Sequence, residues 1–165
     1  MQRIWAPWRM AYLKGQMPEA REGCIFCWKP AEERDEENLI LERRTHCFVI
    51  MNLFPYNNSH LMVVPYRHTG DPGALDDGEL LDCQQAIQRV IRVLGASISP
   101  QGYNVGMNVG SAGGAGIESH LHWHVVPRWA GDTNFMPVTG GTKVISESIQ
   151  EGWQRLRKAF DEHPA

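Results

Sequence analysis

The sequence predicts a single α+β domain in which about five mostly antiparallel strands carry a central helix and a C-terminal helix. Two observations lead to this fold class. Short segments rich in β-branched and aromatic residues recur along the chain, and a longer segment after the third of them has apolar residues at helical spacing. With 165 residues, the chain also has the size of one domain and can bury a sizeable core.

The elements can be placed in order along the chain. The first three strands are expected at residues 39–43, 47–51 and 60–65, and a turn-rich loop with Pro55 precedes the third. The central helix is expected at residues 76–95, where Gly95 can cap its end. A fourth strand, residues 103–109, leads into the glycine-rich segment GSAGGAG, and a fifth follows at residues 118–129. A final amphipathic helix is expected at about residues 146–160, and residues 1–38 look irregular.

Composition excludes several classes of protein. The formal net charge of -3 provides no basic surface of the kind that nucleic-acid binding usually needs. No apolar run approaches the length of a membrane span, and the first residues lack the apolar stretch of a signal peptide. We therefore expect a cytoplasmic protein with neither nucleic-acid nor membrane partners.

The segment ESHLHWHVVPRW, residues 118–129, contains three of the seven histidines at alternating positions. In an extended strand, side chains two residues apart share a face, so His120, His122 and His124 would form one row. The apolar residues between them would share the opposite face and join the core. This arrangement leaves a row of imidazoles facing a cleft or a ligand, which predicts that the segment carries the chemistry.

Four interpretations of the histidine row compete. The histidines could be packed structural residues, or they could hold a zinc ion as three histidines do in zinc enzymes. One imidazole could instead attack phosphorus and form a covalent intermediate, or the row could bind a nucleotide without turning it over. The glycine-rich run at residues 110–116 favours nucleotide chemistry, because its backbone N–H groups can approach phosphate oxygens closely.

These residues form a family pattern. YNVGMNVGSAGGAGIESHLHWHVVPR, residues 103–128, resembles the histidine-triad (HIT) family, whose signature is His-x-His-x-His followed by two apolar residues. CFVIMNLFPYNNSHLMVVPYRH resembles the nucleoside-binding hairpin of that family, and IWAPWRM, CIFC and GDTNFMPV are similar to a bacterial branch associated with diadenosine tetraphosphate phosphorylases. The resemblance implies one HIT-like domain over residues 1–165, with an N-terminal segment 1–38, a catalytic core 39–129 and a C-terminal loop and helix 130–165.

The resemblance also implies catalytic roles for four residues. His122 would attack the α-phosphate of a nucleotide, while the backbone carbonyl of His120 would hold the N–H of its other ring nitrogen. His124 would contact the phosphate and help the leaving group depart. Asn108 falls where the family places an amide side chain, whose N–H donors could stabilise charge on the phosphate oxygens.

Nucleotide-binding residues follow from the same resemblance. Asn52 matches the residue that holds the ribose hydroxyls, although a turn asparagine often satisfies its own backbone instead. His60 would steady the triad, although an isolated strand histidine is often structural. Ile117 stands where many family members have serine or threonine, so altered phosphate contacts are expected. The full expected set is Asn52, His60, Asn108, Gly116, Ile117 and His124.

The pair Cys24 and Cys27 in GCIFC has the spacing of two ligands to one metal ion. In a chain without an export signal, such a pair indicates metal binding or redox chemistry rather than a structural disulfide. Structural zinc needs four ligands, and related nucleotidyltransferases complete the set with positions that match His68 and His120. A structural Zn²⁺ is therefore the expected cofactor, with a pair of bare thiols as the alternative.

The activity implied by the resemblance is a two-step transfer on a dinucleoside polyphosphate. With inorganic phosphate as acceptor, diadenosine tetraphosphate gives ATP and ADP, and with water it gives ATP and AMP. A hydrolase of dinucleoside polyphosphates or nucleoside phosphoramidates and a non-catalytic nucleotide sensor remain alternatives. The resemblance further implies a homodimer, and the second base of the substrate could stack near Trp129 and residues 135–136. No organic cofactor is expected.

Overall fold

The computed structural model describes residues 22–132 and 147–164. The segments IWAPWRM and most of GDTNFMPV, including Phe135 and Met136, lie outside the described residues. No helix within the described ranges is both long and apolar enough to cross a membrane.

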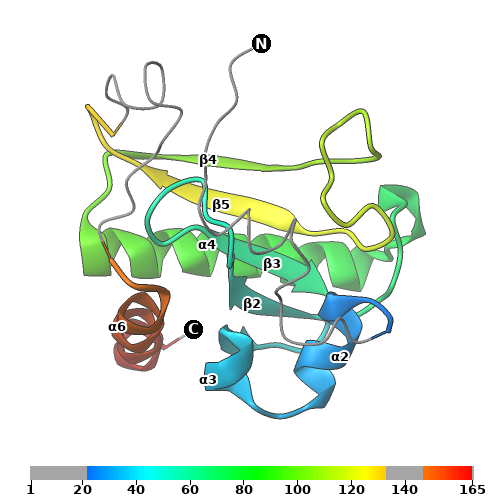
Figure 1. Cartoon of the computed structure of the whole chain (residues 1–165), viewed down its shortest axis with the longest axis horizontal. Helices are drawn as coiled ribbons and strands as arrows, with labels where there is room; N and C mark the ends of the chain where they lie inside the picture. Colours follow the sequence, from blue (N-terminus) through cyan, green and yellow to red (C-terminus); the bar gives the residue numbers. More distant parts are fainter. Residues whose placement is uncertain (1–21, 133–146, 165) are drawn as a thin grey trace.

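Five strands form one open sheet in which each hydrogen-bonded pair is antiparallel, as the sequence predicted (Figure 1). The spatial order of the strands is β1-β2-β3-β5-β4, so β3 and β5 lie side by side although a long helix separates them in the chain. Strands β2 and β3 are apolar and buried at every position, as is typical of the interior strands of a sheet, whereas the edge strand β4 has no fully buried residue. The strands are β1 (Ile40–Arg43), β2 (Cys47–Met51), β3 (Leu61–Pro65), β4 (Gly102–Met107) and β5 (Trp123–Arg128).

Two long helices cover the sheet. The central helix α4 (Asp77–Ile98) begins with a capping box between Asp76 and Glu79, and it follows the single-turn helix η1 (Pro72–Ala74). The C-terminal helix α6 (Ile149–Glu162) packs against α4 and β1. Figure 1 shows α4 running along one face of the sheet with α6 near one of its ends.

The prediction that Gly95 caps α4 is wrong. The helix continues past Gly95 to Ile98 and ends at Ser99, which adopts the left-handed conformation. Gly95 faces Tyr103 of β4: a Cβ there would lie 3.5 Å from the Tyr103 hydroxyl oxygen, an ordinary contact distance, and that hydroxyl donates a hydrogen bond to the Ile91 carbonyl. The helix therefore continues through Gly95 despite the low helix propensity of glycine.

The prediction of an irregular N-terminal segment is also wrong for residues 25–38, which contain two short helices. Helix α2 (Ile25–Ala31) buries Phe26, and helix α3 (Asp35–Asn38) has three acidic residues in its first turn, where the helix dipole favours negative charge. Arg43 of β1 donates to Asp35 of α3. Helices this short show little periodicity in sequence, so contacts with the sheet decide their formation.

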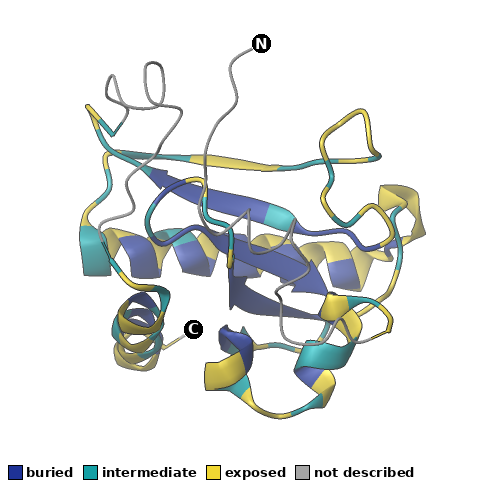
Figure 2. Cartoon of the chain, in the orientation of Figure 1, coloured by how far each residue is buried: buried dark blue, intermediate teal, exposed yellow. Residues whose placement is uncertain are grey.

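The core lies between the sheet and α4. Figure 2 shows the strands β2, β3 and β5 buried almost throughout, with the exposed residues on the outer sides of the helices and the loops. Cys47 and Cys83 are both buried there, as predicted. A hydrogen bond with Cys83 and burial raise the pKa of the Cys47 thiol, so Cys47 stays a protonated packing residue.

A buried ion pair fastens α6 to the rest of the fold. Arg89 of α4 is 6% exposed, donates to Glu42 at 2.8 Å and donates to the Phe160 carbonyl at 3.0 Å. The second carboxylate oxygen of Glu42 is buried without a hydrogen-bond partner. The Arg89 guanidinium therefore both neutralises Glu42 and satisfies the C-terminal end of α6.

Replacing Arg89 by methionine should lower the free energy of unfolding by about 2 kcal/mol, because it leaves the Glu42 carboxylate largely uncompensated. Urea denaturation measures this loss. The matched control is Lys158→Met, which removes an exposed pair with Glu162 and should cost less than about 1 kcal/mol. Equal losses in the two variants would contradict the structural role given to Arg89.

Candidate functional site

The ring of His122 is held in one orientation with one nitrogen left for chemistry. Its Nδ1 lies 2.9 Å from the backbone carbonyl oxygen of His120, which can only accept a hydrogen bond. Nδ1 therefore carries the proton, and Nε2 carries a lone pair. The side chain is 5% exposed, and burial lowers the pKa of His122. A neutral, oriented imidazole is the form that can act as a nucleophile.

His124 has the opposite tautomer, which a chain of hydrogen bonds determines. The backbone N–H of Tyr56 donates to His60 Nδ1 at 3.0 Å, so His60 Nε2 carries a proton and donates to His124 Nδ1, also at 3.0 Å. In the neutral ring, His124 Nε2 is then an N–H donor, and this atom is buried without a partner. The ring centroids of His122 and His124 are 4.9 Å apart. The site thus places the lone pair of His122 Nε2 near the N–H donor of His124 Nε2.

The strand predicted at residues 118–129 is shorter in the structure. Strand β5 begins at Trp123, so His120 and His122 precede it. Residues 120 and 121 instead form hydrogen bonds with the end of β3 and the loop after it. The Leu121 N–H donates to the Thr69 carbonyl at 2.7 Å, and His120 Nε2 donates to the Pro65 carbonyl at 2.8 Å. His122 and His124 still lie together, whereas the His120 ring turns toward the cysteines.

The four residues predicted to bind metal come together at one point. The Sγ atom of Cys24 lies 3.3 Å from His120 Nδ1, and the Sγ atom of Cys27 lies 3.3 Å from His68 Nδ1. The two Nδ1 atoms are 3.2 Å apart, and all four donor atoms lie within 4.8 Å of one another. Tetrahedral zinc with these ligands separates its donors by roughly 3.3–3.8 Å, so the donor set fits this ion.

Hydrogen bonding outside the donor set supports the same conclusion. Because the Pro65 carbonyl accepts from His120 Nε2, the Nδ1 atom of His120 is deprotonated in the neutral ring and faces the cysteines. Metal-bound histidines are commonly oriented by a carbonyl in this way. His120 therefore serves two groups at once: its ring faces the cysteine cluster, and its backbone carbonyl orients His122.

Phe26, which the sequence did not single out, connects these two parts. It lies between the two cysteines in the chain, is 1% exposed, and packs its ring 5.5 Å from the ring of His120 and 5.0 Å from the ring of His122. A large apolar residue between two ligand cysteines was the available signal, but its partner could not be known without the fold. The helix that carries the two cysteines thus also places the Phe26 ring against the imidazole of His122.

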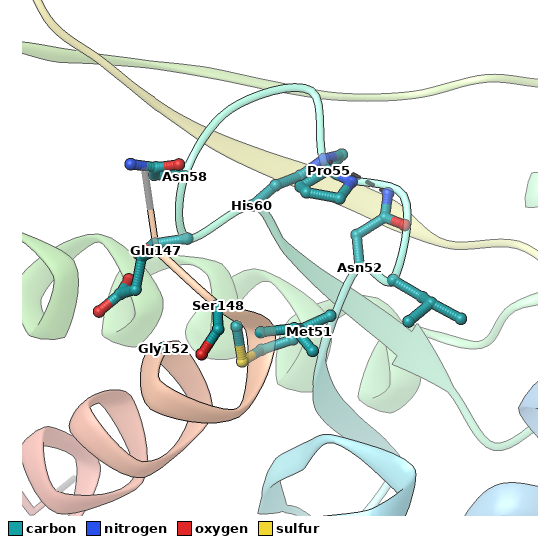
Figure 3. A pocket seen from close by; sticks show the side chains of 11 residues that line it. Met51, Asn52, Pro55, Asn58, His60, Glu147, Ser148 and Gly152 are labelled. Carbon is teal, nitrogen blue, oxygen red and sulfur yellow. Dashed lines mark hydrogen bonds between the residues drawn. The ribbon is translucent and has the colours of Figure 1, made fainter. Parts of the chain in front are cut away.

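Asn52 makes the contacts of a turn asparagine. Its Oδ1 accepts from the Phe54 N–H at 2.9 Å, and its Nδ2 lies 3.3 Å from His60 Nδ1. Figure 3 shows Asn52 and His60 on one side of a cavity of about 360 Å³, with Glu147 and Ser148 at the start of α6 on the other side. These contacts hold the hairpin that carries His60 in place beside the triad.

Asn108 follows the end of β4, not its interior. Met107 pairs with Trp123, so the antiparallel register places Asn108 across from His122. The Asn108 amide donates to the Gly114 carbonyl at 3.4 Å and so contacts the glycine-rich segment. In that segment a Cβ at Gly113 would lie 2.4 Å from the Val109 carbonyl oxygen, which only glycine avoids.

The other two residues expected at the phosphates are Gly116, which ends this segment, and Ile117, which follows it. Gly116 is exposed, and Ile117 is partly buried with its side chain against the core. The isoleucine that replaces the hydroxyl residue is therefore used for packing.

The stability of the chain should depend on pH through His124. Burial, with the nearby His122, lowers the pKa of His124 from 6.5 to about 4. Between these values the unfolded chain binds more protons than the folded chain, so stability falls as the pH falls from 6.5 to about 4. The expected loss is about 3 kcal/mol, measured by urea denaturation at pH 7.5, 5.5 and 4.5. In His124→Gln this part of the pH dependence of the free energy of unfolding should disappear. An unchanged pH dependence would refute its assignment to His124.

The fold and the site together define a class of α+β proteins that present a row of histidines on an open antiparallel sheet beside a glycine-rich loop. The family model described as HIT domain matches residues 33–131, which is more than half of the chain. The chain therefore belongs to the HIT family.

Individual relatives support this membership. An "AP-4-A phosphorylase" of Mycobacterium tuberculosis is 38% identical over 171 aligned residues, which cover 99% of this chain and 87% of the relative. An "adenosine 5′-monophosphoramidase" of Schizosaccharomyces pombe is 25% identical over 64% of this chain and 74% of its own length. A Zn-bound histidine triad family protein of Mycobacterium smegmatis has the same fold, with a TM-score of 0.69 at 24% identity over 85% of this chain and 94% of that one.

Proposed function

We propose that this chain is a phosphorylase of dinucleoside polyphosphates, which converts diadenosine tetraphosphate and inorganic phosphate into ATP and ADP. The observation that carries the proposal is the hydrogen bond from His122 Nδ1 to the His120 carbonyl, which leaves Nε2 as a nucleophile. The name of the Mycobacterium tuberculosis relative, at 38% identity over nearly the full chain, supports the substrate and the acceptor.

The first step forms a bond between His122 Nε2 and the α-phosphorus, and it breaks the bond from that phosphorus to the oxygen that bridges it to the rest of the substrate. The departing nucleotide keeps this oxygen and its electron pair. The His124 Nε2–H donor can stabilise the charge that develops there. The amide of Asn108, which the strand register brings opposite His122, would contact the other phosphate oxygens.

In the second step an oxygen of inorganic phosphate attacks the same phosphorus, and the bond to His122 Nε2 breaks. The nucleoside monophosphate group then leaves as ADP. Because the same site would accept water, hydrolysis of nucleoside phosphoramidates is a second candidate, which the name of the Schizosaccharomyces pombe relative favours.

A structural zinc ion held by Cys24, Cys27, His68 and His120 belongs to this proposal. The support is the donor geometry, with the four atoms within 4.8 Å of one another. When bound, the ion would tie α2 to the segment before β5 and take no part in phosphoryl transfer. The His120 backbone and the Phe26 ring would then keep their places beside His122.

The remaining expectations stay proposals. We infer one domain with a catalytic core at residues 39–129, acting in the cytoplasm as a homodimer. Strand β4 lies at one edge of the sheet, which is compatible with backbone pairing between two copies.

Product analysis tests the proposed reaction. The purified chain is incubated with diadenosine tetraphosphate, with and without millimolar phosphate, and the products are separated by anion-exchange chromatography. ATP and ADP that form only with phosphate would establish the phosphorylase. AMP in place of ADP at all phosphate concentrations would make the chain a hydrolase, and no product would contradict both.

A further inference from the structure

A second hollow lies on the sheet face that carries His122 and His124. Along β5, His124, Val126 and Arg128 alternate with residues that point to the opposite face, so they continue the line of the triad. The hollow has a volume of about 280 Å³, and its lining includes Val126, the next residue after His124 on this face. Its lining residues are Tyr56, Asn57, Asn104, Val126 and Arg128.

Tyr56 forms an aromatic platform between the triad and this hollow. Its ring centroid lies 4.7 Å from that of His60 and 5.5 Å from that of His124, yet the residue is 54% exposed. The same residue fixes the His60 tautomer through its backbone N–H. An exposed aromatic ring in a fixed position is a surface on which a planar base can stack.

Arg128 also lines the hollow, and the buried carboxylate of Asp132 balances its charge. The Nε and Nη2 atoms donate to the two carboxylate oxygens of Asp132 at 2.6 and 2.9 Å, and Nη1 donates to Asn104 Oδ1 at 2.6 Å. Asn57, which is buried, donates to the same carboxylate and to the Pro127 carbonyl. A guanidinium held flat and already paired suits an uncharged planar group better than a phosphate.

The hollow lies at a defined distance from the nucleophile. Arg128 stands six positions after His122, which corresponds to roughly 20 Å of extended chain. The small leaving group of a nucleoside phosphoramidate cannot extend so far from the attacked phosphorus. A leaving nucleotide, with its own phosphates, ribose and base, can.

We propose that this hollow binds the base of the leaving nucleotide, stacked between the Tyr56 ring and the Arg128 guanidinium. This inference rests on the proposed function and adds the residues that would select dinucleotides over compounds with a small leaving group. It places the second base at Tyr56 and Arg128, beside the Trp129 region in which the sequence suggested stacking.

The test fills the hollow from the exposed edge strand. Asn104→Phe puts a ring into it, and Val105→Phe is the matched control, because Val105 is the next residue of β4, is 45% exposed and points to the other face. The kcat/KM is measured for diadenosine tetraphosphate and for adenosine 5′-phosphoramidate, whose leaving group is ammonia. Thermal unfolding of both variants checks that they fold.

For Asn104→Phe, the ratio of kcat/KM for the dinucleotide to that for the phosphoramidate should fall about ten-fold or more, whereas Val105→Phe should leave the ratio as it is. Tyr56→Leu removes the platform without filling the hollow, and about the same fall is expected from lost stacking. A ratio that stays constant in Asn104→Phe and Tyr56→Leu would overturn the inference while leaving the proposed function intact. Absence of dinucleotide cleavage by the unmodified chain would overturn both.

Discussion

Replacing His122 by alanine should lower the rate of cleavage of diadenosine tetraphosphate by at least about 10⁴-fold, because the attacking nitrogen is lost. Nucleotide binding should change much less, since Asn52, Asn108 and the glycine-rich segment are untouched. Turnover is measured by product chromatography, and affinity for AMP is measured by calorimetry. His122 is 5% exposed, and thermal unfolding checks that the variant folds.

The matched control is His163→Ala, which removes an exposed histidine at the end of α6. It should keep full activity. If His122→Ala retained more than a tenth of the activity, a covalent intermediate on this residue would be excluded. The nucleotide-sensor interpretation makes the opposite prediction: the unmodified chain would bind nucleotides and show no turnover at all.

Replacing Cys24 by alanine should remove zinc from the purified protein and lower both stability and activity. Loss of a structural zinc ligand removes binding energy that contributes directly to folding, and the expected cost is several kcal/mol. Activity should fall because the His120 carbonyl and the Phe26 ring, which contact His122, lose their attachment to the cysteine pair. Metal analysis by mass spectrometry and thermal unfolding measure the first two effects.

Cys83→Ala is the matched control for this prediction. Cys83 is buried in α4, outside the cluster of four donors, so its replacement should cost some stability but keep one equivalent of zinc. Less than a tenth of an equivalent of zinc in the unmodified protein would exclude the zinc site. Full activity of a zinc-free Cys24→Ala variant would instead show that the cysteine pair is not needed to position His122.

The sequence predicted the sheet and the long helices because both depend on periodic apolar patterns. Helix α4 follows a helical pattern, and strands β2 and β3 are short continuous apolar runs that are buried throughout. The two short helices at residues 25–38 were missed because they form through contacts with the sheet, such as the one between Arg43 and Asp35. The end of α4 was misplaced because a glycine was expected to end the helix, whereas Ser99 adopts the left-handed conformation that ends it.

The residues of the candidate site likewise fall into those that the sequence predicted and those that it did not. Residues that lie in motifs, namely the histidine row and the CxxC pair, could be chosen from the sequence, and the structure brings Cys24, Cys27, His68 and His120 together. Residues that act only by packing against the site could not be identified from the sequence. Phe26 and Tyr56 pack against the triad from distant segments, and the sequence does not show which residues they will contact. The tautomers of His60 and His124 likewise depend on a backbone N–H at residue 56.

Stereochemistry at phosphorus tests the central claim, transfer through His122, most directly. A dinucleoside polyphosphate with a chiral α-phosphorothioate is cleaved in the presence of phosphate, and the configuration of the ADP thio-analogue that forms is determined by NMR. Each in-line displacement inverts the phosphorus, so attack by His122 followed by attack by phosphate predicts net retention. Net inversion would mean that phosphate attacks the substrate directly, and it would contradict a covalent intermediate on His122.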